Sequence, residues 1–127
     1  MARLWLADDD PTYLYMIAEV LRPMGHELTL FNDGASLFKR MEGAQGTLPD
    51  LILMDVMMPG FDGYTLQQKL QGDERFRGIP LIVMTAKSNV RELFAQAQNV
   101  VAFLEKPAQI NVVQATVAKI LKDSGVS

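Results

Sequence analysis

Short apolar runs alternate along the chain with longer segments that are apolar at helical spacing. Five of the runs have the length of β-strands, and three are almost wholly apolar, as is typical of parallel strands that are covered on both faces. The predicted strands are Arg3–Ala7, Leu28–Phe31, Leu51–Met54, Leu81–Met84 and Val100–Leu104.

The intervening segments predict five helices. The first opens at Asp10-Pro11, because proline is tolerated at a first helical position. In the fourth, Ser88 is the expected N-cap and Asn99 the expected left-handed residue at the end. The other helices are predicted from about Asp33 to Met41, Gly63 to Leu70, Ser88 to Gln98 and Gln109 to Lys122. Strands and helices in this alternation predict an α/β fold of the (βα)5 type, with a parallel sheet between two helical layers.

Composition and charge narrow the class of protein. A chain of 127 residues fits one domain, and 49% hydrophobic with 21% charged residues is typical of a folded globular protein. The net charge of −3, the pI near 5.0 and the lack of a Lys/Arg cluster argue against direct nucleic-acid binding. No apolar stretch approaches the roughly 18 residues of a membrane span, and neither cysteine nor a secretory leader is present. We therefore expect a soluble, cytoplasmic protein that does not bind membranes.

Chemically active side chains stand where four of the predicted strands end. Ligands of doubly wound sheets bind beyond the carboxyl ends of the strands. The first strand is followed by Asp8-Asp9, the third by Asp55, the fourth by Thr85 and the fifth by Glu105-Lys106. With the strand order 2-1-3-4-5, these four strand ends would share one edge of the sheet.

Three carboxylates in one cleft repel each other, and their pKa values would rise unless a cation neutralised them. All-oxygen ligation with room for water favours Mg²⁺, with Asp9 and Asp55 as candidate direct ligands. A buried Lys106 ammonium also needs an anionic partner. We expect Lys106 to face a group bound at this site and Thr85 to donate its hydroxyl to the same group.

Each of these residues also has an ordinary structural explanation. "ADDDPT" could be a strand-to-helix turn with Asp10 as the N-cap, and Asp55 could cap the turn "MMPGFDG". Lys106 alone could be a surface lysine with a buried stem. The conjunction of these residues at four strand ends is what indicates a functional site.

These residues resemble the receiver domain of two-component response regulators, a phosphoacceptor domain that also occurs alone as the chemotaxis regulator. The resemblance covers nearly the whole chain. It rests on Asp8-Asp9, on "LILMDVMMPGFDG" around Asp55, on "IPLIVMTA" with Thr85, and on "FLEKP" with Lys106-Pro107. It implies a flavodoxin-like doubly wound fold of strand order 2-1-3-4-5, with residues 1–127 forming one receiver domain.

The resemblance implies that Asp55 accepts a phosphoryl group from a histidine of a sensor histidine kinase or a histidine phosphotransfer protein. It also implies that Asp9, Asp55 and the backbone carbonyl of Met57 hold Mg²⁺, with Asp8 acting through a water molecule. Thr85 and Lys106 would bind the phosphoryl oxygens. Such a chain is not an enzyme beyond its own phosphorylation and dephosphorylation.

The resemblance further implies a conformational switch on phosphorylation and slow dephosphorylation afterwards. Thr85 would move to bond the phosphoryl group, leaving space for Phe103 to turn inward, which would couple the site to a partner-binding face of the fourth helix, fifth strand and fifth helix. Met57 and Lys87 stand two residues after Asp55 and Thr85. Since neither can accept a proton from an attacking water, hydrolysis should be slow. The bond between Lys106 and Pro107 should be cis.

Two departures from the family pattern affect the fourth helix. The spacing from Thr85 to Lys106 is one residue shorter than expected, and "AQNVVAFL" replaces the usual alanine-glycine-alanine and acidic pair. We therefore expect the fourth helix to be shortened or displaced, and no dimer to form through this face.

Two other functions compete. Asp8, Asp10 and Thr12 fit the D-x-D-x-T pattern of haloacid-dehalogenase-like phosphatases, in which Asp8 would be the nucleophile. Such enzymes need a later acidic pair for Mg²⁺, yet no acidic residue follows Lys106 until Asp123. The other alternative is a degenerate receiver that acts only as an interaction module.

Overall fold

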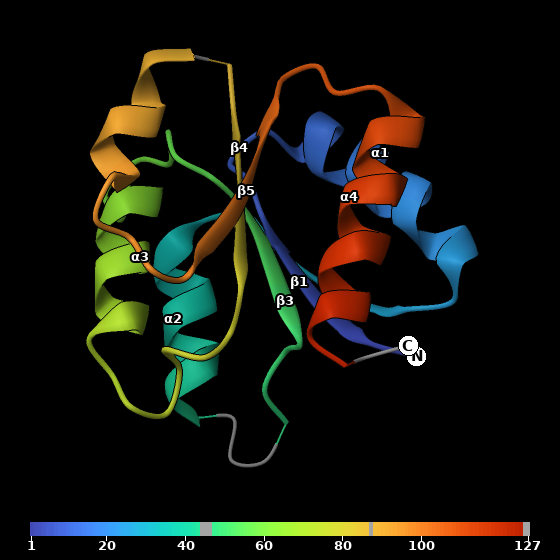
Figure 1. The fold of residues 1–127 in the computed structure, drawn as a ribbon. Coiled ribbons are helices and arrows are strands. Elements are labelled where there is room, and N and C mark those ends of the chain that lie inside the picture. The colour runs from blue at the N-terminus through green and yellow to red at the C-terminus, as the bar shows by residue number, and fades with distance from the viewer. Residues whose placement is uncertain (44–46, 87, 126–127) are drawn as a thin grey trace.

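A five-stranded parallel sheet lies between two helical layers in the computed structural model, which describes residues 1–43, 47–86 and 88–125 (Figure 1). The strands are β1 (Arg3–Ala7), β2 (Glu27–Phe31), β3 (Leu51–Asp55), β4 (Leu81–Thr85) and β5 (Val100–Glu105). They lie in the order β2-β1-β3-β4-β5. The predicted fold class and strand order are confirmed, and each predicted strand matches an observed one to within a residue at either end.

Within the described residues, four α-helices and two 3₁₀ segments lie between or after the strands. They are α1 (Pro11–Leu21), η1 (Arg22–Met24), α2 (Gly34–Gly43), α3 (Gly63–Gln71), η2 (Ser88–Phe94) and α4 (Ile110–Asp123). As Figure 1 shows, α1 and α4 cover one face of the sheet, whereas α2, α3 and the gold-coloured η2 lie on the other. None of the described helices is long and apolar enough to cross a membrane.

Two apolar clusters fill the space between the sheet and its helical layers. Alternate residues of each strand point to opposite faces, so Leu4 and Leu6 join the cluster under α1 and α4, whereas Trp5 and Ala7 join the one under α2 and α3. All five residues of β3 and of β4 are buried. Packing of the sheet between the two helical layers holds the strand ends, and with them the candidate site, in fixed positions.

The connection between β4 and β5 differs from the helix that the apolar pattern predicts. It contains η2, a seven-residue 3₁₀ segment, in place of an α-helix reaching Gln98, so the expected shortening is confirmed. The left-handed conformation predicted for Asn99 is wrong, since no non-glycine residue of the described chain has a positive φ. Asn99 is instead buried, and its carboxamide pairs with Gln67 of α3. Lys87 and the side chain of Ser88 lie outside the described part of the chain.

Strand β5 carries a bulge near its start. Leu81 pairs with Val100 while Ile82 pairs with Ala102, so Val101 is an extra residue opposite β4. After the bulge, Ala102 packs toward α4 and Phe103 toward η2. The bulge therefore sets which face of the sheet Phe103 occupies.

Candidate functional site

The carboxyl ends of β1, β3 and β5 bring two carboxylates and one ammonium into contact. Nζ of Lys106 lies 2.5 Å from Oδ2 of Asp8 and 3.1 Å from Oδ2 of Asp55. Asp8 is fully buried and Asp55 is 5% exposed. The peptide bond between Lys106 and Pro107 is cis, as expected, and the Lys106 amide donates to the Thr85 carbonyl at 2.8 Å. The predicted strand-end residues therefore meet at one edge of the sheet.

Burial and ion pairing act against each other within this cluster. Burial raises the pKa of Asp8, and its contacts with Lys106 and the Asp10 amide offset this only in part. Burial by itself would lower the pKa of Lys106, but the contacts with Asp8 and Asp55 raise it overall. The ammonium is thus held in its charged form, whereas the Asp8 carboxylate carries a desolvation penalty that additional positive charge would relieve.

A third carboxylate completes an all-oxygen group. One oxygen each from Asp8, Asp9 and Asp55 lies within 4.8 Å of the other two. Asp9 is exposed, so the group opens to solvent. Three carboxylates facing one lysine leave an excess of negative charge, and hard oxygen ligands with room for water suit Mg²⁺. The residues present therefore fit the predicted cation.

Aspartate also organises the turn that enters α1. The Asp10 carboxylate accepts from the backbone N–H groups of Thr12 at 3.0 Å and Tyr13 at 3.4 Å. The Asp10 amide donates to Oδ1 of Asp8 at 3.0 Å. Asp10 is thus the N-cap of α1, and this turn accounts for the D-x-D-x-T pattern in structural terms.

The loop after Asp55 packs tightly against the end of strand β3, which it follows. The Met57 amide points to Oδ1 of Asp55 at 3.3 Å, and Asp62 caps α3 by accepting from the Thr65 amide at 2.8 Å. A Cβ at Gly63 would lie 2.6 Å from the Asp55 carbonyl oxygen and 2.8 Å from the Val56 Cα. In the sequence Gly63 is an ordinary turn residue, but in the structure only glycine permits this approach.

Thr85 and Phe103 occupy the same face of the sheet. Phe103 pairs in register with Val83, and Thr85 lies two residues farther along β4, so both side chains point toward the α3 layer. Thr85 is 2% exposed, and the Phe103 ring is half-buried. This placement suits the coupling that we predict between them.

Three residues of the site's surroundings escaped the sequence analysis. The Tyr13 ring lies 4.4 Å below Nζ of Lys106, and burial raises the pKa of its phenol. Arg91 and Phe94 of η2 both contact Phe103. The position of Tyr13 just after the Asp10 cap could have indicated its contact. The η2 residues could not have been found, because their pattern predicts a longer α-helix.

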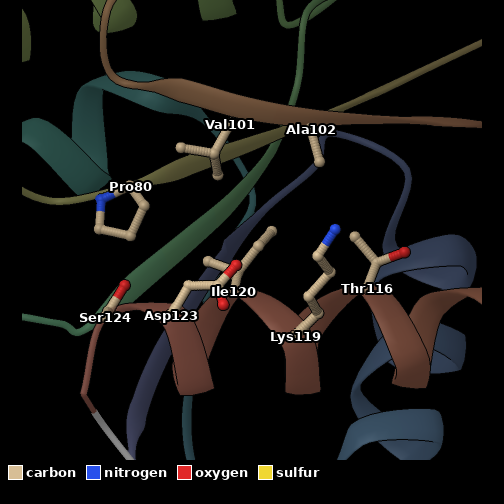
Figure 2. Close-up of a pocket in the computed structure, with 8 residues that line it drawn as sticks. All are labelled: Pro80, Val101, Ala102, Thr116, Lys119, Ile120, Asp123 and Ser124. Atoms are coloured by element: carbon tan, nitrogen blue, oxygen red, sulfur yellow. The ribbon is translucent and has the colours of Figure 1, made fainter.

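Two hollows differ in their relation to the strand ends. A groove of about 500 Å³ lies beside Asp55, and its lining includes Met57, Pro59, Tyr64 and Leu93. A second hollow of about 380 Å³ lies between β5 and α4, where Figure 2 shows Ile120 and Lys119 of α4 pointing toward the strand. Its strand residues, Val101 and Ala102, lie near the start of β5, so it belongs to the opposite end of the sheet from Asp55.

Comparisons of sequence agree on one family. The sequence model of the response regulator receiver domain matches residues 4–118. Protein PilH of Pseudomonas aeruginosa is 29% identical over 122 residues, which are 95% of this chain and 98% of PilH. The DNA-binding transcriptional regulator NtrC of Escherichia coli K12 is 30% identical over 119 residues. These cover 93% of this chain but only 24% of NtrC.

Solved structures show the same fold. A putative response regulator from Chloroflexus aurantiacus superposes with a TM-score of 0.85 at 28% identity, covering 95% of this chain and 98% of that one. The receiver domain of the sensor histidine kinase PA1611 from Pseudomonas aeruginosa superposes with a TM-score of 0.81 at 28% identity and the same coverage. That domain was solved with a magnesium ion coordinated in its active site cleft.

Proposed function

Because the chain belongs to the response regulator receiver domain family, we propose that Asp55 is the phosphoacceptor of a two-component phosphorelay. The donor is a phosphohistidine of a sensor histidine kinase or a histidine phosphotransfer protein. The observation that carries the proposal is the Asp55 carboxylate, 5% exposed, held 3.1 Å from the Lys106 ammonium within a group of three carboxylates. We assign the whole of residues 1–127 to this one domain.

The transfer itself requires little covalent chemistry from the protein. An Asp55 carboxylate oxygen forms a bond to phosphorus as the bond between phosphorus and the donor imidazole nitrogen breaks, and the electron pair remains on the imidazole. Such in-line transfers depend on positioning and on neutralising charge. Lys106 supplies one positive charge directly, and the Thr85 hydroxyl donates to the transferred group. The chain has no enzymatic role beyond its own phosphorylation and dephosphorylation.

Asp8, Asp9, Asp55 and the Met57 carbonyl are the residues that would hold Mg²⁺. The close approach of the three carboxylates supports this assignment, as does the magnesium in the similar PA1611 domain. Bound there, the ion would offset the charge on the phosphoryl oxygens. Asp8 would act through a water molecule, since its own oxygens already contact Lys106 and the Asp10 amide.

The product adds a dianion at a crowded strand end, and Thr85 responds by moving toward it. Phe103 then turns into the space that Thr85 leaves. The shared face of these two residues supports this step. The surface altered by the switch is the one formed by η2, β5 and α4, where a partner would bind.

The experiment compares the wild-type chain with Asp55→Asn and Asp8→Asn, each incubated with acetyl phosphate and Mg²⁺. We expect intact-mass spectrometry to show one added phosphate on the wild type and none on Asp55→Asn. A phosphatase would instead lose its labelling in Asp8→Asn and retain it in Asp55→Asn. Asp123→Asn, an exposed change at the end of α4, is the matched control and should label fully. Full labelling of Asp55→Asn would refute the phosphoacceptor assignment.

A further inference from the structure

The short η2 segment contacts Phe103, the proposed switch residue, through two side chains. The Arg91 guanidinium carbon lies 4.8 Å from the centre of the Phe103 ring, a cation–π contact. The Phe94 ring packs on the same side chain, with ring centres 6.0 Å apart and planes inclined at 58°. Both contacts come from a single 3₁₀ turn, so Phe103 cannot change position without affecting η2.

Phe94 extends this contact to helix α3. It is only 4% exposed, and its ring meets Tyr64 edge-on with ring centres 5.8 Å apart. Phe103, Phe94 and Tyr64 thus form a continuous row of aromatic rings from β5 through η2 to α3. Tyr64 and Leu93, the neighbour of Phe94, both line the groove beside Asp55. The row therefore ends at a surface that also includes Met57.

The segment after η2 is fixed to α3 by amide side chains. Nε2 of Gln67 donates to Oδ1 of Asn99 at 3.0 Å and to Oε1 of Gln71 at 3.0 Å. The backbone N–H of Gln98 donates to the same Gln71 oxygen at 2.7 Å. Asn99 also bonds to β4, because its backbone carbonyl accepts a hydrogen bond from the Leu81 backbone N–H at 2.8 Å. Residues 98–99 are thus anchored to α3 and β4, so a displacement of the described connection would involve η2 and the turn that follows it rather than these two residues.

We propose that the contacts of Arg91 and Phe94 with Phe103, here called the clasp, are broken when Phe103 turns inward. Their loss would change the shape of the groove lined by Met57, Tyr64 and Leu93, between η2 and the loop after β3. This inference rests on the proposed function, because the inward turn follows phosphorylation. It adds that the signal also reaches the α3 side of the molecule through Phe94 and Tyr64. If phosphorylation favours the conformation in which the clasp is broken, then a substitution that weakens the clasp must in turn favour the phosphorylated conformation.

The test uses NMR of the full chain with labelled leucine methyl groups and labelled aromatic rings, with and without beryllofluoride and Mg²⁺ as the phosphoryl mimic. In the wild type, we expect signals of Phe103, Tyr64 and Leu93 all to change. In Phe94→Leu, Phe103 should still reach its position with beryllofluoride, while the responses of Tyr64 and Leu93 fall at least about twofold, because the aromatic row is interrupted.

Arg91→Gln supplies a second variant, since Arg91 is exposed and its replacement leaves the core intact. Without its cation–π contact, the free protein should already show Phe103 and Leu93 signals displaced toward their positions with beryllofluoride. The control is Lys69→Gln on α3, which removes a cation–π contact with Phe38 of α2, outside the clasp. It should leave the free spectrum of Phe103 and Leu93 unchanged.

The outcomes separate the two proposals. A wild type in which Phe103 responds while Tyr64 and Leu93 do not would overturn the clasp and leave the phosphoacceptor assignment intact. Arg91→Gln spectra that match the wild type in the free state would also overturn it. A wild type that shows no response at all to beryllofluoride, even near Asp55, would overturn the proposed function and the clasp together.

Discussion

Among the described residues, two groups of buried polar side chains are built on opposite principles. At the carboxyl ends of the strands, Asp8 and Asp55 share one lysine, and the three charges do not balance. Between α3 and β5, Gln67 and Asn99 are as deeply buried, at 2% and 4% exposed, but they are neutral and pair with each other. The first group costs folding energy because of its desolvated charge, whereas the second stabilises the connection into β5.

The difference shows how burial relates to function in one small domain. A neutral, paired cluster is complete in the free protein and gains nothing from a ligand. A charged cluster with excess negative charge becomes complete only when a cation binds, and it can then respond to a newly attached phosphate. Four predictions test this contrast, from the largest expected effect to the smallest.

The first prediction disrupts the charged cluster through the backbone. Gly63→Ala places a Cβ against the Asp55 carbonyl oxygen and the Val56 Cα, neither of which can yield. We expect the free energy of unfolding to fall by about 3 kcal/mol, together with weaker labelling by acetyl phosphate. Urea unfolding measures the first effect. A Cβ at Gly43 meets nothing within 4 Å, so Gly43→Ala should not destabilise; equal losses in both variants would contradict the close-contact argument.

The second prediction tests whether the amide cluster is complete in itself. Gln67→Leu leaves Oδ1 of Asn99 without its donor, and Asn99→Leu removes one of the two acceptors of Nε2 of Gln67, so each single variant should cost about 1–3 kcal/mol. The double variant should cost clearly less than the sum of the two, since neither partner is then left behind. Phosphorylation at Asp55 should continue in all three. Gln68→Ala, an exposed neighbour on α3, is the control; additive losses in the double variant would show that the pair is not coupled.

The third prediction concerns solvent access to the charged cluster. Met57 is 54% exposed beside Asp55, and with Lys87 it offers no proton acceptor to an attacking water. Met57→Asn combined with Lys87→Glu should shorten the lifetime of the phosphoryl group about tenfold, equivalent to about 1.4 kcal/mol off the barrier. A desalted, acetyl-phosphate-loaded sample followed over time gives the lifetime. An unchanged or longer lifetime would exclude this explanation of slow hydrolysis.

The fourth prediction removes one charge from the cluster. Asp8→Asn replaces a fully buried carboxylate by a neutral group and leaves Lys106 paired with Asp55. Since burial disfavours the charged form of Asp8, the change should raise the free energy of unfolding in magnesium-free buffer by about 1 kcal/mol. Since folding raises the pKa of Asp8 above its ordinary 3.8, the wild-type penalty is full at neutral pH and declines as the pH falls through the raised pKa. The advantage of the variant should decline in the same direction. Unfolding curves at several pH values measure it, and magnesium should stabilise the variant less than the wild type.

The fold and the meeting of the site residues could be predicted because both follow from short-range patterns. Strand runs and helical spacing give the (βα)5 alternation, and residues at strand ends must converge on one edge of a parallel sheet. Asp8, Asp55 and Lys106 are in contact for this reason. The sequence also indicated a shortened connection before β5, through its spacing and the altered residues around Asn99.

Contacts that depend on exact backbone paths could not be predicted. The 3₁₀ form of η2 places Arg91 and Phe94 on Phe103, and no spacing rule for an α-helix yields that arrangement. Asn99 was expected to cap a helix because its tolerance of left-handed backbone is a local property. Its pairing with Gln67, 32 residues away, is a tertiary contact that outweighs that preference. The close packing of Gly63 on the Asp55 backbone could not be predicted either, because it is also a tertiary contact.

The bulge at Val101 has a consequence for solubility. Strand β5 lies at one edge of the sheet, and the run "VVAFL" contains neither the lysine nor the proline that commonly protects such edges. An apolar edge strand with regular spacing is a template for another chain to add to, and so for aggregation. A bulge interrupts that spacing and twists the edge, which makes continuous pairing with a neighbouring molecule unfavourable. The extra residue that orients Phe103 therefore also helps to keep the protein from aggregating at high concentration.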